Sequence, residues 1–140
     1  MNKIFITVII LYFFTSLVHA NQYSKYYNLG IKYYNNNNLD IAKFNFEKDI
    51  VRNTKNLNSY LYLAKIFKKK NNRDEFEKNL KTVLLLDPKN EEALYFIIIK
   101  KYKDGDYNYA EEKFNIFKKS CVKLCKKKLE LSELINKPKS

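Results

Sequence analysis

Glycine and proline are scarce in this chain, which contains two of each among its 140 residues. A sheet of several hairpins needs more of these turn-forming residues than the sequence offers. Hydrophobic residues nevertheless make up 46% of the chain, which is enough for a core. The composition therefore predicts an all-α protein whose helices are joined by short polar connections, and the length suits a single domain.

Histidine is almost absent too, and the single one lies in an N-terminal segment, residues 1–20, that has the pattern of a secretory signal peptide. Lys3 gives this segment a positive start, residues 4–14 are apolar except for one threonine, and small residues precede a cleavage point after Ala20. The apolar run is shorter than the ~20 residues of a membrane span. We therefore expect cleavage and export to the periplasm or the medium of a bacterium. An uncleaved anchor formed by residues 4–18 is the alternative.

Removal of this leader leaves a chain without histidine. Such a chain cannot build a His-based catalytic triad, a His general base or a His metal site. No acid pair and no Ser/Lys arrangement in the sequence points to catalysis either. We therefore predict a protein that is not an enzyme and that has no catalytic residues, no cofactor and no metal site.

Acidic residues are few relative to basic ones: 15 Asp and Glu stand against 27 Lys and Arg, which gives a formal charge of +12. Only Arg52 and Arg73 are arginines, whereas proteins that read nucleic-acid bases favour arginine. Since an exported protein also seldom meets nucleic acid, we predict no such partner. The densest basic group offers weak contact with anionic lipid or cell-wall polymer, although a solvated helix face is the simpler explanation. This group, the Lys belt, consists of Lys118, Lys119, Lys123, Lys126, Lys127 and Lys128.

A regular period organises most of the remaining chain. Amphipathic patterns predict helices over residues 57–69 and 73–86, with a polar turn between them and a stop at Asp87-Pro88. The same order of helix, turn, helix and polar break recurs on both sides. We predict these flanking helices over residues 23–34, 39–51, 91–102 and 107–119. Residues 21–122 thus contain three units, at residues 23–56, 57–90 and 91–122.

Corresponding positions in the three units carry similar residues, and the small ones among them allow helices to approach closely. They are Tyr26, Leu29, Gly30, Tyr33, Ala42 and Phe46 in the first unit, Tyr60, Leu63, Ala64, Phe67, Leu80, Asp87 and Pro88 in the second, and Leu94, Gly105, Asp106, Tyr107, Ala110 and Phe114 in the third. This pattern resembles the tetratricopeptide repeat (TPR) family, whose unit is a helix–turn–helix of about 34 residues. The resemblance implies a right-handed helical-repeat solenoid of three helix pairs, completed by a C-terminal capping helix.

The same resemblance implies a concave groove, lined by the first helix of each unit, that binds a protein or peptide. The side chains carried over to it are aromatic, with a lysine cluster in the middle, which suits a peptide with apolar anchors and an acidic group. They are Tyr27, Ile31, Tyr34, Asn58, Leu61, Lys65, Lys68, Lys69, Tyr95, Ile99 and Tyr102. Family members that grip a C-terminal carboxylate carry Lys and Asn where this chain has Tyr27 and Ile31, so we predict no clamp of that kind.

We therefore expect an exported, non-enzymatic scaffold that binds a protein or peptide partner. The alternative is a peripheral component of the cell envelope, anchored by the leader and touching anionic lipid or cell wall through the Lys belt.

The helical pattern continues past the third unit into the C-terminal segment, and no glycine or proline interrupts it before Pro138. One prediction is a break near Ser120, with a capping helix and tail over residues 123–140. The other is that the last repeat helix runs unbroken to about residue 136. We favour the unbroken helix slightly, because Val122 stands where a proline would have stopped it.

Two cysteines, Cys121 and Cys125, lie in this C-terminal segment. On a helix, residues four apart share one face, with Cα atoms about 6 Å apart, which is within disulfide range. Export favours oxidation, but the geometry on an intact helix is poor. We therefore place free thiols first, a disulfide second and a metal site last.

Overall fold

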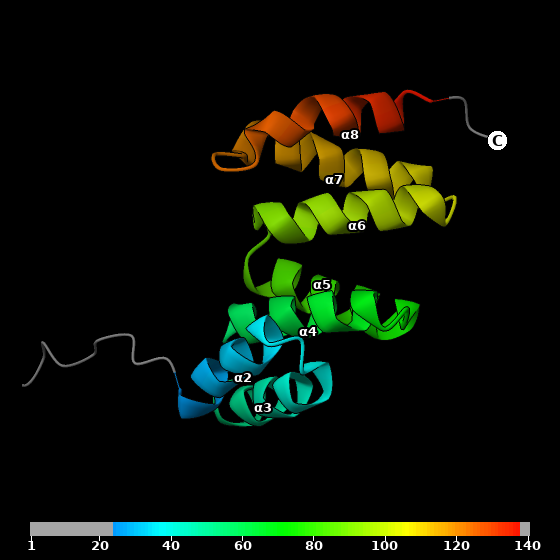
Figure 1. Ribbon diagram of the computed structural model, residues 1–140. Coiled ribbons are helices and arrows are strands. Elements are labelled where there is room, and N and C mark those ends of the chain that lie inside the picture. The colour runs from blue at the N-terminus through cyan, green and yellow to red at the C-terminus, as the bar shows by residue number, and fades with distance from the viewer. Residues whose placement is uncertain (1–23, 138–140) are drawn as a thin grey trace, which may run out of the picture.

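A computed structural model describes residues 24–137, and every regular element in that range is helical (Figure 1). The predicted leader, Tyr23 and the predicted stop at Pro138 lie outside the described residues. The elements are α2 (Lys25–Asn35), α3 (Leu39–Arg52), α4 (Leu57–Lys69), α5 (Arg73–Leu86), α6 (Glu91–Lys103), α7 (Tyr107–Ser120), the 3₁₀ turn η1 (Cys125–Lys127) and α8 (Lys128–Ile135).

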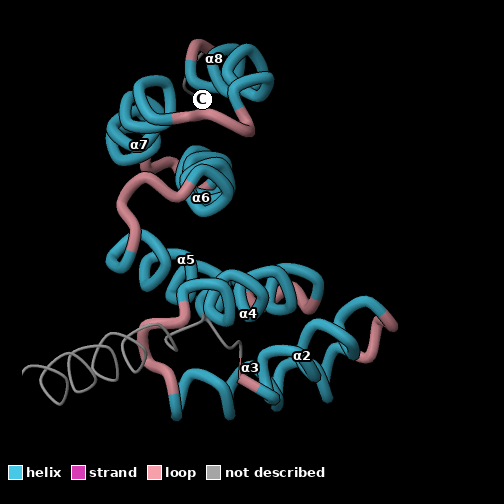
Figure 2. The backbone as a smooth tube through the Cα atoms, turned by 90° about the vertical axis from the view of Figure 1, so that its left-hand side faces the viewer, coloured by secondary structure: helices cyan, strands magenta, loops and turns pink. Residues whose placement is uncertain are grey.

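The helices stack as three pairs, α2 with α3, α4 with α5 and α6 with α7, and α8 packs against both α6 and α7. Figure 2 shows that α2, α4, α6 and α8 form one layer and α3, α5 and α7 the other. The predicted all-α solenoid of three helix pairs with a C-terminal capping helix is therefore confirmed.

The period is visible in the backbone as well as in the side chains. Each turn inside a helix pair contains one residue with positive φ, namely Asn37 (57°), Asn71 (56°) and Gly105 (81°), and these occupy equivalent positions in the three units. Asn and Gly adopt this left-handed conformation at lower cost than other residues. The polar residue that follows each of them precedes the second helix, and Asn72 and Asp106 accept hydrogen bonds from backbone N–H groups of its first turn.

The core consists of two clusters that meet between α5 and α6. Phe46, Ala64 and Leu80 belong to the first cluster, which joins α2 to α5 and includes part of α6. Leu94 and Leu131 belong to the second, which joins α6, α7 and α8. Because no single helix pair buries its own apolar faces, stacking with the next pair supplies the core, as in other repeat proteins.

One polar contact ties the first unit to the second inside the core. The carboxylate of Asp49 is fully buried and accepts hydrogen bonds from the side chains of Ser24, Asn56 (2.6 Å) and Ser59 (2.5 Å). These donors satisfy a buried carboxylate that would otherwise be costly. One repeat further along the chain, Val83 corresponds to Asp49 and Ala93 corresponds to Ser59. The junction between the second and third units therefore cannot form these hydrogen bonds.

The prediction of an unbroken last helix is wrong, because α7 ends at Ser120. The carboxylate of Glu91, at the start of α6, accepts hydrogen bonds from the backbone N–H groups of Val122 (2.8 Å), Lys123 (3.0 Å) and Leu124 (2.5 Å). Since these N–H groups point at Glu91, they are not available to continue a helix. The repeat period predicts this break, because Arg52, Leu86 and Ser120 end their helices at equivalent positions of the three units.

The structure joins Cys121 and Cys125 in a disulfide, with Cα atoms 5.3 Å apart. The prediction that placed free thiols ahead of a disulfide is therefore wrong. That ranking assumed an intact helix. Instead, Cys121 has extended backbone angles (φ −65°, ψ 139°) and Cys125 begins η1, so the two side chains do not follow helical geometry.

Candidate functional site

A hollow lies on the surface between α4, α5 and α6. Its volume is ≈ 240 Å³, and the rings of Phe67, Phe76 and Phe96 line it together with basic side chains. We call it the aromatic cleft; it is lined by Phe67, Lys68, Asn71, Asn72, Arg73, Phe76, Phe96, Ile99, Lys100, Lys103 and Asp104.

A second, wider hollow of ≈ 620 Å³ adjoins it through Phe96, at the N-terminal ends of α4 and α6. This wide cleft is lined by Asn58, Leu61, Asp87, Lys89, Asn90, Glu91, Glu92, Tyr95, Phe96, Lys123, Leu124 and Lys127. The two clefts together follow the facing sides of α4 and α6, which is where the sequence predicts the groove.

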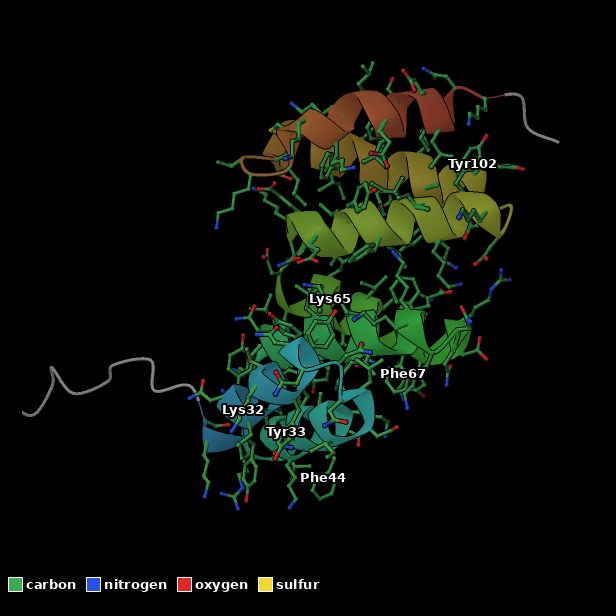
Figure 3. All side chains as sticks on the ribbon, viewed as in Figure 1. Lys32, Tyr33, Phe44, Lys65, Phe67 and Tyr102 are labelled. Atoms are coloured by element: carbon green, nitrogen blue, oxygen red, sulfur yellow. A yellow bond between two sulfur atoms is a disulfide. The ribbon has the colours of Figure 1, made fainter. Side chains whose placement is uncertain are left out.

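Helical spacing explains why these side chains meet. Residues three or four apart share one face of a helix, so α4 presents Leu61, Lys65 and Lys68 toward α6. The side chain of Lys65 lies between the two helices (Figure 3) and its Nζ is 2.8 Å from Glu92 Oε1. The groove therefore contains an ion pair that connects the second unit to the third.

The centre of the aromatic cleft is Phe96. Its ring lies edge-on to that of Phe76, with centroids 6.1 Å apart. The Nζ atom of Lys68 lies 4.2 Å from the centroid of the Phe96 ring, a cation–π distance. Among the described residues no ion pair joins Lys68, Arg73 or Lys103 to an acidic group. The cleft thus combines an apolar floor with cations available to a ligand.

The remaining cation of the cleft, Lys100, is already neutralised. Its Nζ lies 2.6 Å from Glu77 Oε2 and 2.5 Å from Asp104 Oδ2. Glu77 also pairs with Lys101 and Lys81, each at 2.8 Å. Partial burial raises the pKa of Glu77, but the hydrogen bonds from these three lysines outweigh it and lower the pKa to about 2.

The predicted groove residues of the first unit lie in a different environment. Tyr27 and Tyr34 are half-buried, and their rings lie edge-on to Tyr62, with centroids 6.3 and 5.0 Å away. Lys69 covers Tyr34, with Nζ 4.7 Å from its centroid, and Ile31 packs against the first core cluster. These side chains join α2 to α4 and therefore contribute to packing as well as to the groove wall.

The predicted groove residues of the third unit meet α8. The hydroxyl of Tyr95 donates to Glu130 Oε1 (2.7 Å), and that of Tyr102, labelled in Figure 3, donates to the carbonyl oxygen of Lys137 (3.3 Å). The hydrogen bond to Glu130 raises the pKa of Tyr95. The segment that contains α8 therefore borders the groove at this end, while Tyr95 also lines the wide cleft between α4 and α6.

The sequence predicts Lys68 and Ile99 in the groove but does not predict Phe96, Phe76 and Arg73 there. Phe96 stands three residues before Ile99 on the same helical stripe, so its place could have been inferred. Phe76 and Arg73 lie in the first turn of α5, whereas the resemblance implies a groove lined by the first helix of each unit, so only the packing of α5 on α6 brings them to the cleft.

No group of three or more His, Cys, Asp and Glu side chains between residues 24 and 137 is arranged to hold a metal ion. Within the same range, no helix has both the length and the apolar character that crossing a bilayer requires.

No protein-family model matches the sequence, and no curated protein matches it. The fold does match solved structures. One of them, the complex of the TPR2B domain of yeast Sti1 with pHsp70, aligns with a TM-score of 0.68 over 83% of this chain and 94% of that domain. Because the two sequences are 15% identical, the match defines the fold alone. The chain therefore has the fold of a TPR domain.

Proposed function

We propose that this protein is an exported, non-enzymatic scaffold that binds a segment of a partner protein along the stretch between α4 and α6. The observation that carries the proposal is the aromatic cleft, where three phenylalanine rings lie beside Lys68, Arg73 and Lys103. An apolar side chain of the partner enters the cleft, and a neighbouring acidic residue pairs with the cations at its edge.

The size of the cleft favours a peptide over a small molecule. At ≈ 240 Å³ it is smaller than the about 300–1,000 Å³ of typical small-molecule pockets. It accommodates one anchoring side chain, while the wide cleft next to it provides room for the following residues of an extended segment. Rigid helices hold the cleft in place, so little conformational entropy is lost on binding.

Two further observations support the proposal. The similar TPR2B domain was solved in a complex with pHsp70, so a domain with this fold is able to bind a partner. Export is supported by the leader pattern of residues 1–20 and by the Cys121–Cys125 disulfide, since disulfides persist in oxidising compartments.

Selection of random peptides on the immobilised protein tests the proposal. We expect the enriched peptides to contain an apolar residue followed or preceded by Asp or Glu. Fluorescence anisotropy then measures their affinity for Lys68→Glu/Lys103→Glu, which we expect to be weaker by about tenfold or more because two attractive charges become repulsive. The matched control is Lys118→Glu/Lys119→Glu, two exposed lysines of the Lys belt. Enrichment of basic peptides, or equal loss of affinity in both double variants, would show that the cleft is not the binding site.

A further inference from the structure

The outer face of α3 carries an exposed apolar stripe that is separate from the groove. Ile41, Phe44 and Val51 are 43%, 55% and 80% exposed. Their spacing places them along one side of the helix, and Phe44 points away from the stack at its N-terminal end (Figure 3). Tyr26 from α2 lines the same shallow hollow as Phe44 and Val51.

The repeat architecture does not require apolar residues here. The equivalent positions of the second unit, in α5, hold Glu75 in place of Ile41 and Lys78 in place of Phe44. In α7 the position that corresponds to Phe44 holds Glu112. Since two of the three second helices present polar side chains at the position of Phe44, an apolar residue there is a property of α3 and not of the fold, whereas Val51 has an apolar counterpart in Leu85 of α5.

Cations accompany the stripe. The Nζ atom of Lys48 lies 4.3 Å from the ring centroid of Phe44 and 5.4 Å from that of Tyr26. The guanidinium of Arg52 lies 4.8 Å from the centroid of Tyr26. Glu47 borders the same hollow, but Lys43 neutralises it at 2.7 Å. The surface is therefore both apolar and positively charged.

We propose that this surface, the α3 stripe (Tyr26, Ile41, Phe44, Lys48, Val51 and Arg52), docks onto a membrane that contains anionic lipid. Aromatic and aliphatic side chains that protrude from one side of a helix enter the interface of a bilayer, while lysine and arginine next to them contact anionic headgroups. A second copy of the chain fits the stripe less well, because a symmetric contact would bring Lys48 and Arg52 of both copies together.

The position of the stripe in the stack agrees with this role. The helix α3 lies at one end of the solenoid, whereas α8 lies at the other (Figure 1). The Lys belt, which the sequence suggested as the lipid contact, lies at the opposite end.

Vesicle flotation tests the proposal. The chain from residue 21 to residue 140, which includes every described helix, is mixed with vesicles of phosphatidylcholine alone or with phosphatidylglycerol added. We expect the protein to bind only the anionic vesicles. The double variant Phe44→Glu/Val51→Glu should weaken this binding by about tenfold or more. The matched control is Leu85→Glu, because Leu85 has the place of Val51 on α5 and is 82% exposed; it should bind as the unchanged protein does.

A direct reporter is also available, since the chain contains no tryptophan. In Phe44→Trp the fluorescence should shift to the blue with anionic vesicles and not with neutral ones. Equal binding of Phe44→Glu/Val51→Glu and the unchanged protein would overturn the proposal. So would loss of binding in Lys118→Glu/Lys119→Glu alone, or a Phe44-dependent dimer in size-exclusion chromatography without lipid affinity. Circular dichroism of each variant confirms that it is folded.

Discussion

The ion cluster around Glu77 offers a quantitative test of how the second and third units are joined. Glu77 lies on α5, and two of its partners, Lys100 and Lys101, lie on α6. The cluster therefore connects helices on both sides of the junction between the two core clusters. Replacing Glu77 with Gln keeps the size of the side chain but removes the charge that three lysines share.

The magnitude follows from the pKa of Glu77, which falls from 4.5 to about 2 on folding. A shift of this size stabilises the folded state at neutral pH by at most ~3 kcal/mol. Water around the lysines screens part of this, so we expect Glu77→Gln to lower the free energy of unfolding by ~1–2 kcal/mol. A carboxylate with a lowered pKa stabilises the folded state above its unfolded pKa of 4.5, and this contribution disappears as the pH falls toward about 2.

The assay is urea unfolding followed by circular dichroism at pH 7, 5, 4 and 3. The difference between the unchanged protein and Glu77→Gln should be largest at pH 7 and should shrink below pH 4.5. Glu75→Gln is the control, because among the described residues Glu75 forms an ion pair only with Lys78 on its own helix, and such pairs contribute ~0.3–0.5 kcal/mol. If both variants lose equal stability at pH 7, or if the loss from Glu77→Gln does not depend on pH, the cluster does not join the units.

Two further predictions concern packing in the first unit, and urea unfolding measures both. A Cβ atom at Gly30 would lie 2.6 Å from the fully buried ring of Phe46. Gly30→Ala should therefore lower the free energy of unfolding by ~1–3 kcal/mol, and Phe46→Leu in the same chain should recover part of this loss. If the losses from the two substitutions add, this contact does not limit the site. Asp49→Val should lower the free energy of unfolding by ~2–3 kcal/mol because buried donors lose their acceptor. Adding Ser59→Ala, so that both positions match the residues one repeat further along, should reduce this loss of stability. An unchanged loss would show that the hydrogen bonds do not tie the units together.

The sequence predicted the helices well because the signal for a helix is local. Apolar residues at helical spacing and asparagine-rich turns gave α4 and α5 the bounds that the structure has. The repeat period then predicted how the pairs stack, since equivalent residues must make equivalent contacts. For the candidate site the outcome is mixed. Lys68 and Ile99 line the aromatic cleft, whereas Phe76 and Arg73 reach it from a helix that the sequence alone did not place there.

The fold can therefore be predicted from the sequence, because helix positions, repeat length and the order of packing depend on residues close together in the chain. Other features depend on partners far apart in the chain and become visible only in three dimensions. Glu91 holds the segment after Ser120 by accepting three backbone hydrogen bonds, and Cys121 and Cys125 pair in that segment. Tyr95 and Tyr102 donate hydrogen bonds to Glu130 and to the carbonyl oxygen of Lys137, so the C-terminal segment borders the groove at this end. Such contacts are made by individual side chains across the stack, and helical periodicity does not predict them.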